Sequence, residues 1–309
     1  MFWRGINKFK NIEIVPGGAA YGFGSYNTLG RTYFVNNITG SATNDGLRWD
    51  RAMDQPSTAI TASEVYRQDR GSVTTNDYIR NTIVIQGTGT AYTALVALPS
   101  YCDIIGIGAD PFGNGAGIAR IGADSGTSEG VLATATVRGV NFYNLQFQAG
   151  TGGYAFKGTS LFRSNFVHCC FATNGDPGGT PAAGFEMGIC GGVNMTDCMW
   201  NNQSAAAAQF TVGFNITSTH FHGCVVKDCH IGGDVGIAIA AGCVNAWGSR
   251  FQNCYIGELS EACSIGVDDN ATTGHIIYAG CFMRATDSFD LVDDATRIIG
   301  CTAANAFET

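Results

Sequence analysis

Charged residues, prolines and long apolar runs are scarce in this chain. Of its 309 residues, 14% are Asp, Glu, Lys or Arg, and only 6 are proline. A disordered chain is richer in both charge and proline, so the composition excludes extensive disorder. No apolar run reaches the roughly 18 residues of a membrane-spanning helix, and no apolar segment follows residues 1–10 as in a secretory signal peptide. We therefore expect no membrane partner.

Glycine and apolar residues are abundant instead. The chain contains 43 glycines, and 45% of its residues are hydrophobic. Many glycines combined with few charges are typical of short strands joined by tight turns. The length would otherwise suggest two domains, but single all-β architectures also reach this size. We expect one all-β architecture with a substantial core.

The charges are distributed unevenly. Residues 1–163 contain 13 Lys and Arg against 11 Asp and Glu, whereas residues 164–309 contain 4 against 14, a balance of −10. A nucleic-acid groove needs clustered Lys and Arg, so this acidic half argues against nucleic acid as a partner. It also disfavours the unaided binding of polyanionic sugars.

A repeat of 20 to 31 residues runs through the second half of the chain. Its reference residues are Leu145, Cys169, Cys198, Cys229, Cys254, Cys281 and Cys301. The residue before each is polar or small: Asn144, His168, Asp197, Asp228, Asn253, Gly280 and Gly300. Three residues before the reference, an apolar residue recurs: Phe142, Phe166, Met195, Val226, Phe251, Tyr278 and Ile298. Two residues after it, another recurs: Phe147, Phe171, Trp200, Ile231, Ile256, Met283 and Ala303.

Repeats of this size indicate a solenoid. The reference residue and the second residue after it face the same side of a strand, and the polar residue between the apolar ones suits a bend. We predict a right-handed parallel β-helix with three short strands per circuit and eight or nine rungs. Cys169, Cys198, Cys229, Cys254, Cys281 and Cys301 would form a ladder of reduced thiols in the core. Disulfides between stacked rungs are the alternative.

Earlier rungs are predicted upstream at Asn81–Gln86, 101–108 and 119–123. The glycine-rich residues 110–117 between the last two are interpreted as a surface turn. Residues 31–69 contain a strand at Thr32–Val35, a Gly-Ser and Asn-Asp-Gly loop, Trp49, and a helix from about Pro56 with Ile60, Val65 and Tyr66 on its apolar face. Thr61 and Glu64 have the spacing of a capping box.

This opening resembles that of proteins in the pectin-lyase-like β-helix superfamily. The resemblance implies that the helix covers the N-terminal end of the solenoid. It divides the chain into an arm (1–30), an entry strand, loop and capping helix (31–80), and a β-helix (81–309). Bacteriophage surface and tailspike-type proteins, together with carbohydrate-active enzymes, share this architecture, and the phage members are commonly trimers.

The first thirty residues combine aromatic, apolar and basic side chains, as a docking segment would. The residues concerned are Phe2, Trp3, Arg4, Ile6, Lys8, Phe9 and Lys10. We expect this arm to bind another virion protein. The alternative is that the arm folds back along its own β-helix.

Catalytic residues are hard to find in the sequence. Hydrolases of the superfamily carry Asn-x-Asp, Asp-Asp, Gly-His-Gly and Arg-x-Lys motifs. Here Asp268 and Asp269 match the aspartate pair, His275 follows too closely, and no Arg-x-Lys follows. These three residues are weak catalytic candidates, and Asp268–Asp269–Asn270 is interpreted as a corner loop. A lyase would need a cation and a Lys or Arg base, for which the acidic half offers little.

Two further surface features are noted. His220 and His222 would share one face of a strand and are weak metal candidates, with partly exposed strand histidines as the alternative. Tyr143 and Tyr255 lie outside the apolar columns and are the better candidates for sugar contact. No cofactor is predicted.

The sequence therefore favours a non-enzymatic bacteriophage protein on the virion surface, assembled in the host cytoplasm. It would be a homotrimer acting in capsid decoration, as a spike or in the tail, with a surface polysaccharide as a further partner. The alternative is an extracellular polysaccharide lyase or glycoside hydrolase of the same superfamily. A surface-layer or adhesive protein would share every feature of the first hypothesis.

Overall fold

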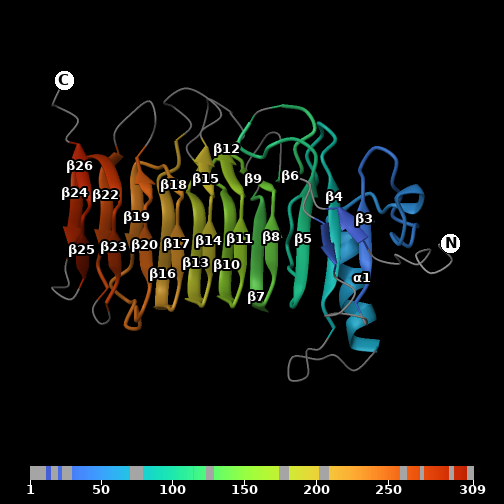
Figure 1. Ribbon diagram of the computed structural model, residues 1–309, viewed down its shortest axis with the longest axis horizontal. Coiled ribbons are helices and arrows are strands. Elements are labelled where there is room, and N and C mark those ends of the chain that lie inside the picture. The colour runs from blue at the N-terminus through green and yellow to red at the C-terminus, as the bar shows by residue number, and fades with distance from the viewer. Residues whose placement is uncertain are drawn as a thin grey trace, which may run out of the picture.

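The computed structural model describes residues 12–14, 20–22, 30–69, 79–113, 115–122, 129–173, 181–201, 209–257, 263–271, 275–291 and 296–304. Apart from a short antiparallel pair, β1 (Ile12–Ile14) and β2 (Ala20–Gly22), its strands pair in parallel. They wind into a right-handed parallel β-helix (Figure 1). The predicted fold class is confirmed.

Three sheets form the sides of the solenoid. Sheet I contains β3 (Thr32–Val35), β4 (Asn81–Gln86), β5 (Cys102–Ile107), β8 (Asn141–Tyr143), β11 (Asn165–Val167), β14 (Asn194–Thr196), β17 (Val225–Lys227), β20 (Arg250–Gln252), β23 (Ile277–Ala279) and β25 (Arg297–Ile299). Sheet II contains β6 (Arg120–Gly122), β9 (Gln146–Ala149), β12 (Cys170–Thr173), β15 (Met199–Asn201), β18 (His230–Ile231), β21 (Tyr255–Ile256), the start of β24 (Phe282–Leu291) and β26 (Thr302–Ala304). Sheet III contains β7 (Val131–Arg138), β10 (Tyr154–Phe162), β13 (Ala183–Gly191), β16 (Val212–His222), β19 (Val235–Ile239), β22 (Cys263–Asp269) and the end of β24.

The strand register confirms the sequence repeat. Each residue of the apolar column from Phe142 to Ile298 is paired with the equivalent residue of the next rung. Sheet I has ten strands, not the eight or nine rungs expected. The predicted number of rungs was too low because the entry strand β3 and the last strand β25 both stack in register with the repeat. At about 4.8 Å per rung, the stack is about 43 Å long.

Single residues with a left-handed backbone turn two of the three corners. Between sheets I and II they are Asn144, His168, Asp197, Asp228, Asn253, Gly280 and Gly300, with φ from 52° to 63°. Between sheets III and I they include Gly139, Arg163, Gly192, Gly223 and Gly248. Asn, Asp and Gly are the residues that adopt this conformation at least cost. The polar position of the repeat is therefore explained by backbone geometry.

Stacked side chains fill the interior. Phe142 lies 4.7 Å from Phe166 and Phe251 lies 5.2 Å from Tyr278, measured between ring centroids. The cysteine column lies beside these rings. The Cys198 thiol donates to the Phe166 carbonyl of the preceding rung, with an S–O distance of 3.6 Å. The twelve cysteines carry free thiols, all buried except the half-buried Cys301.

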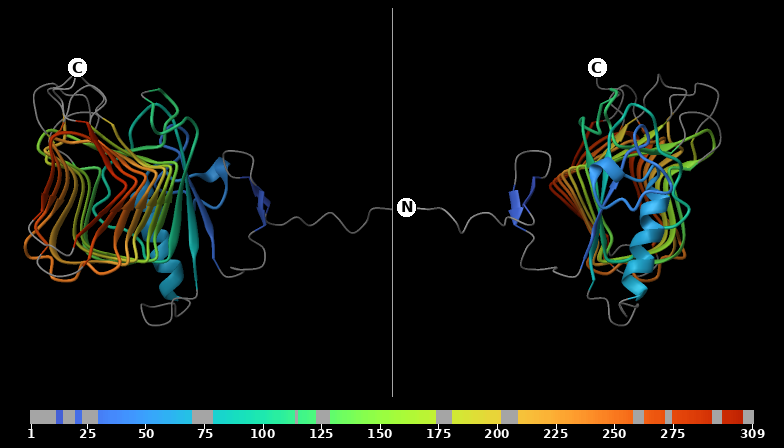
Figure 2. Two further views of the ribbon diagram at one scale, coloured as in Figure 1. Left: turned by 60° about the vertical axis from the view of Figure 1, so that its left-hand side comes forward. Right: turned by 90° about the vertical axis from the view of Figure 1, so that its right-hand side faces the viewer.

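Helix α1 (Pro56–Asp69) lies across the N-terminal end of the solenoid and contacts β3 and β4 (Figure 2). Ile60 is buried as expected, but Val65 is 52% exposed. Ser63 and Arg67 are buried in its place, because Arg67 pairs with Glu64 and Ser63 binds Asn81 of β4. The capping-box interpretation is wrong, since the Thr61 hydroxyl bonds Ser57 inside the helix. Within the described ranges, no helix is long and apolar enough to span a membrane.

The buried cysteine column makes a prediction about thiol reactivity. Burial raises the pKa of the Cys198 and Cys229 thiols well above the ordinary value, so little reactive thiolate forms there. In native protein, a thiol reagent at neutral pH should label at most the half-buried Cys301 quickly. In denaturant without reductant, most of the twelve thiols should react. Finding nearly all of them paired under denaturing conditions would contradict the ladder of reduced thiols.

Candidate functional site

An aromatic ridge follows the corner between sheets III and I. It consists of Phe162, His222, Trp247 and His275, hereafter the corner ridge. Phe162 is in register with Gly191 of the next rung, and Gly191 with His222. The Gly223 N–H donates to the Trp247 carbonyl, which places Trp247 on the rung after His222. The ridge therefore spans five rungs, or about 19 Å at 4.8 Å per rung.

Trp247 is the most prominent member of the ridge. Its side chain is 52% exposed, and its ring centroid lies 4.9 Å from that of His275 in an edge-to-face arrangement. The segment that carries it is fixed, because the Phe221 N–H donates to the Asn245 carbonyl and the Ser249 hydroxyl donates to the Phe221 carbonyl. A large indole held on a fixed backbone at the surface offers contact area at little entropic cost.

Gly191 allows the rings of Phe162 and His222 to approach each other. A Cβ on Gly191 would lie 2.7 Å from the Phe162 ring and 2.9 Å from the His222 ring. The two rings therefore converge over the missing side chain. The Arg138 guanidinium lies 5.0 Å from the centroid of the Phe162 ring and extends the ridge by one rung.

His220 is held by its neighbours. Its Nδ1 lies 2.5 Å from the Thr219 hydroxyl, and its Nε2 lies 3.0 Å from the Asn245 amide nitrogen. The centroids of the His220 and His222 rings are 6.1 Å apart, on the same side of β16. Both His220 nitrogens are therefore engaged within the chain. No group of three or more possible ligands occurs in the described part of the chain.

A polar row crosses the outer face of sheet III. The Lys157 ammonium lies 2.9 Å from Glu186 Oε1, and the Asn215 amide donates to Glu186 Oε2 at 2.9 Å. Burial lowers the pKa of Lys157, but its hydrogen bonds to Glu186 and Tyr154 raise it by more, so the ammonium form is favoured. Both carboxylate oxygens of Glu186 therefore have partners on the neighbouring rungs.

Asp268 and Asp269 lie on opposite faces of β22 and cannot act as a pair. Asp269 is fully buried and accepts hydrogen bonds from the Thr296 hydroxyl at 2.9 Å and the Ala271 N–H at 3.2 Å. Asp268 lies on the outer face and binds Asn270. The corner-loop interpretation was wrong because both aspartates belong to a strand, in which side chains alternate.

The register gives Asp268 a different neighbour. Asp290 of β24 is its partner on the next rung, and both lie on the outer face of sheet III. His275, the third catalytic candidate, lies on the corner ridge against Trp247. Sequence reasoning missed the Asp268–Asp290 pair because the two residues lie in different repeats. It missed Trp247 because this residue lies outside the apolar columns.

The other predicted surface residues lie elsewhere. His168 Nδ1 lies 2.7 Å from Asp197, and the centroid of its ring lies 4.4 Å from that of Phe112 in a tilted arrangement, so it ties residues 110–113 to the solenoid. Tyr255 stacks at 5.4 Å on Phe282, and His230 meets it edge-on at 4.7 Å. Because Phe282 covers one face of Tyr255, this tyrosine is less suited to stacking on a sugar than Trp247. Tyr143 is half-buried in sheet I. The side chains of the N-terminal arm lie outside the described residues.

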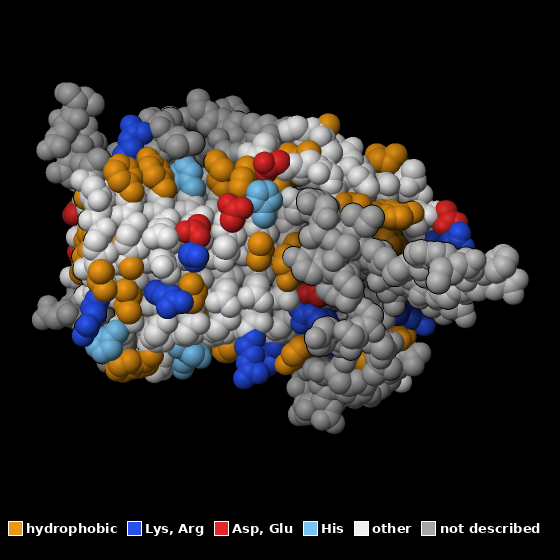
Figure 3. All heavy atoms as spheres, in the orientation of Figure 1, with side chains coloured by type: hydrophobic (Ala, Val, Ile, Leu, Met, Phe, Trp, Pro, Cys, Tyr) orange, Lys and Arg blue, Asp and Glu red, His pale blue; other side chains and the backbone are white. Residues whose placement is uncertain are grey.

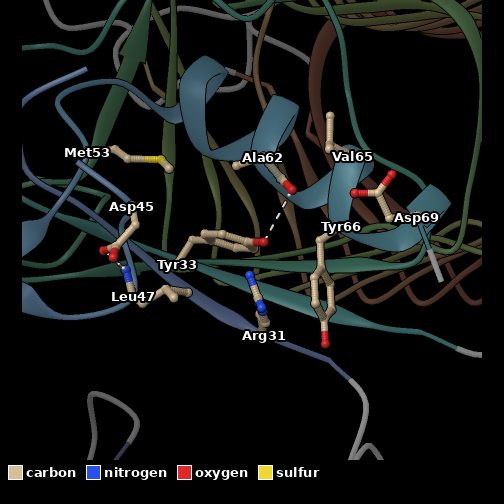
Figure 4. A pocket seen from close by; sticks show the side chains of 9 residues that line it. All are labelled: Arg31, Tyr33, Asp45, Leu47, Met53, Ala62, Val65, Tyr66 and Asp69. Carbon is tan, nitrogen blue, oxygen red and sulfur yellow. Dashed lines mark hydrogen bonds between the residues drawn. The ribbon is translucent and has the colours of Figure 1, made fainter. Parts of the chain in front are cut away.

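A cavity of about 570 Å³ lies between α1, β3 and the entry loop (Figure 4). Arg31, Tyr33 and Asp45, which line it, have partners in the chain. The Arg31 guanidinium lies 4.0 Å from the centroid of the Tyr66 ring, and the Tyr33 hydroxyl donates to the Ala62 carbonyl. Asp45 pairs with Arg51. Burial raises the pKa of Tyr33, which keeps the phenol neutral. These contacts fasten the capping helix to the solenoid.

Comparisons with known proteins identify the fold. No protein-family model matches the chain, and no curated protein matches it. A solved structure of the pectin methylesterase from Aspergillus niger, in its deglycosylated form, is similar. It is 13% identical, with a TM-score of 0.55, and the match covers 90% of this chain and 87% of that chain. The likeness shows the parallel β-helix fold alone.

The separation of the two aspartates predicts different effects on stability. Replacing Asp269 by Ala removes a buried acceptor and leaves the hydroxyl of Thr296 unpaired, so it should cost about 2–4 kcal/mol of unfolding free energy. Asp268→Ala, on the outer face of the same strand, should change it by less than about 0.5 kcal/mol. Urea unfolding of both variants measures this. Equal losses would show that the inward placement of Asp269 is wrong.

Proposed function

We propose that this chain recognises a polysaccharide along the corner ridge. The observation that carries the proposal is the exposure of Trp247 on a fixed backbone, in line with three further rings over five rungs. A pyranose ring has an apolar C–H face that stacks on aromatic side chains and a rim of hydroxyl groups that needs polar neighbours. The exposed Thr159 and Thr217 of sheet III, three and five residues before Phe162 and His222 along their strands, provide polar groups on the adjoining face.

The shape of the solenoid supports a linear polymer as the ligand. Equivalent residues recur at each rung, so a ridge along the axis offers repeated contacts to a repeating chain. Once one sugar of the polymer is bound, the next sugars are held near the following rungs at a high effective concentration, so several weak contacts together give a useful affinity. The structurally similar protein is by name an esterase of pectin, which is itself a polysaccharide.

Hydrolysis of the polysaccharide is a second candidate function. It is favoured by the in-register pair Asp268 and Asp290 on the outer face of sheet III. Two carboxyl groups one rung apart, at about 5 Å, have the spacing that retaining glycosidases use for an acid and a nucleophile. Glu186 is three rungs from Asp268, about 14 Å, which is too far for a second catalytic carboxylate.

Attachment of a bacteriophage particle to its host is the biological setting that we propose. The low charge and the aromatic, basic residues Phe2, Trp3, Arg4 and Lys8 support it. In this setting the arm docks on another virion protein, and the solenoid presents the ridge to a surface polysaccharide. The homotrimer expected from the sequence belongs to the same proposal.

Substitution of Trp247 tests the polysaccharide proposal. Trp247→Ala should weaken binding at least tenfold in affinity electrophoresis against a panel of neutral and acidic polysaccharides, because the largest stacking surface is lost. Val244→Ala is the matched control: Val244 is 43% exposed three residues away and lies outside the ridge. Equal binding by both variants to every polysaccharide that the parent binds would refute the ridge.

The same panel separates binding from hydrolysis. If the parent protein shortens a polysaccharide and Asp268→Asn or Asp290→Asn stops this while leaving retention unchanged, the second candidate function is correct. Retention without shortening supports recognition alone.

Deletion of residues 1–30 tests the virion setting. The truncated chain should fold with an unchanged circular dichroism spectrum and bind polysaccharide as before, since the ridge begins at Phe162. It should fail to join the particle when produced during infection. Normal incorporation of the truncated chain would refute a docking role for the arm.

A further inference from the structure

Exposed arginines that lack a carboxylate partner border the corner ridge. Arg138 ends β7 and Arg163 follows Phe162 of the ridge, while Arg250 begins β20 and Arg297 begins β25. All four arginines are exposed, and none of them forms an ion pair within the part of the chain that the structure describes. The border of the ridge therefore carries positive charge that no described carboxylate contacts.

Two lysines elsewhere on the solenoid have carboxylate partners. Lys157 on sheet III lies 2.9 Å from Glu186, and Lys227 on sheet I lies 3.3 Å from Asp228. Figure 3 shows Lys, Arg and His side chains along the lower edge of its face, where Figure 1 labels β10, β13 and β16, whereas most Asp and Glu side chains lie higher. The negative balance of residues 164–309 thus does not describe the charge at this corner.

The acidic pair of sheet III lies too far away to neutralise the arginines. Asp268 and Asp290 belong to the same outward column as Lys157. Lys157 stands five residues before Phe162 in β10, which is about 16 Å at 3.3 Å per residue. Exposed charges further apart than about 10 Å are largely screened from one another at 0.1 M salt. The positive potential of the corner therefore persists beside the ridge.

Arg138 and Arg163 extend along the ridge. The Arg163 N–H donates to the Gly191 carbonyl at 2.8 Å, which fixes its backbone to the next rung. A Cβ on Gly192 would lie 3.8 Å from Arg163 Cγ, so the stem of this arginine passes beside that glycine. The Arg138 guanidinium lies 5.0 Å from the centroid of the Phe162 ring, which also belongs to the next rung. Cationic groups and rings therefore share this edge of the solenoid.

The positive charges are spaced along the axis. Arg163 and Arg250 lie three rungs apart, or about 14 Å. Arg250 and Arg297 share one outward column of sheet I and lie two rungs apart, or about 10 Å. A small anion contacts one of these positions at a time, whereas a polymer with acidic groups along its length reaches several. The spacing thus suits a charged polymer.

We propose that the polysaccharide recognised by the corner ridge is acidic, and that its anionic groups pair with Arg163 and Arg250 while a sugar ring stacks on Trp247. This inference rests on the proposed function, because it names the class of ligand for the same ridge. A guanidinium group binds carboxylate, sulfate or phosphate oxygens through two parallel N–H donors. The arginines therefore read the charge of the polymer, and the rings contact its C–H faces.

Three forms of one polymer test the charge of the ligand. Dextran, carboxymethyl-dextran and dextran sulfate share a backbone and differ in their anionic groups. The parent protein should bind at least one charged form about tenfold more tightly than dextran in biolayer interferometry, since hydrogen bonds between charged groups are stronger than neutral ones. Its own net charge of −8 opposes non-specific retention by both charged forms. Comparison of the two separates a carboxylate ligand from a sulfate ligand.

Charge-matched variants locate the binding. Arg163→Gln with Arg250→Gln should weaken binding to the charged form by about tenfold, because two charge-assisted contacts are lost. Arg48→Gln with Arg51→Gln is the matched control: it removes the same charge from the entry loop, where these side chains are 73% and 57% exposed, and should leave binding unchanged. Trp247→Ala should weaken binding to charged and neutral polysaccharides alike. Circular dichroism confirms that each variant is folded.

The outcomes distinguish the acidic ligand from the ridge itself. Binding of the parent protein to neutral polysaccharides only, or equal effects of the two folded double arginine variants, would overturn the acidic ligand. The ridge would still stand if Trp247→Ala weakened binding to a neutral polysaccharide. Loss of binding in the Arg163 and Arg250 variant with no effect of Trp247→Ala would refute the stacking ridge. Tighter binding of oligothymidylate than of every acidic polysaccharide would assign the arginines to single-stranded nucleic acid and overturn the inference.

Discussion

The stacking of each rung on the next at about 4.8 Å is the constraint on which the rest of the structure depends. A parallel, in-register stack places equivalent residues directly above one another, so any side chain at a repeat position must tolerate a copy of its own type as a neighbour. Phenylalanines and cysteines meet this demand inside the solenoid. Phe156, Phe185 and Phe214 follow one another with centroid distances of 5.5 and 5.1 Å. On the outside, amides meet the same demand by donating to the next amide along the axis.

The corners follow from this constraint. Each circuit must turn sharply without disturbing the register, and single residues with φ of 51–72° achieve this between sheets I and II and between sheets III and I. Asn, Asp and Gly dominate these positions. Tyr101, Arg163 and His168 are exceptions, with φ of 51°, 51° and 53°. The contacts of His168 with Asp197 and Phe112 compensate for its less favourable conformation by holding the adjacent loop.

The repeat constrains the outward-facing positions less than it constrains the core. Core positions are uniform because they share one environment, whereas outward positions vary and differ from sheet to sheet. Sheet III carries the polar row and leads to the corner ridge, and sheet I carries a row of asparagines that donate to one another along the axis. The uneven charge of the sequence, with −10 on residues 164–309, conceals this arrangement. Arg250 belongs to the acidic half of the sequence, yet it lies in the same corner region as Arg163 of the other half.

The sequence by itself determined the interior of this protein. The apolar columns, the turn residues, the cysteine ladder, the bounds of β3 and the start of α1 could be predicted because local periodicity decides which side chains face inward. The tertiary structure alone decided which outward side chains meet. Asp268 and Asp269, adjacent in sequence, lie on opposite faces, while Asp268 meets Asp290 and Trp247 meets His275 across rungs. The reason is physical. Alternation along a strand determines which side chains face the core and which face solvent. Rungs of 20 to 31 residues carry loops of different length, however, so only the folded stack fixes which residue of one rung lies over which residue of the next.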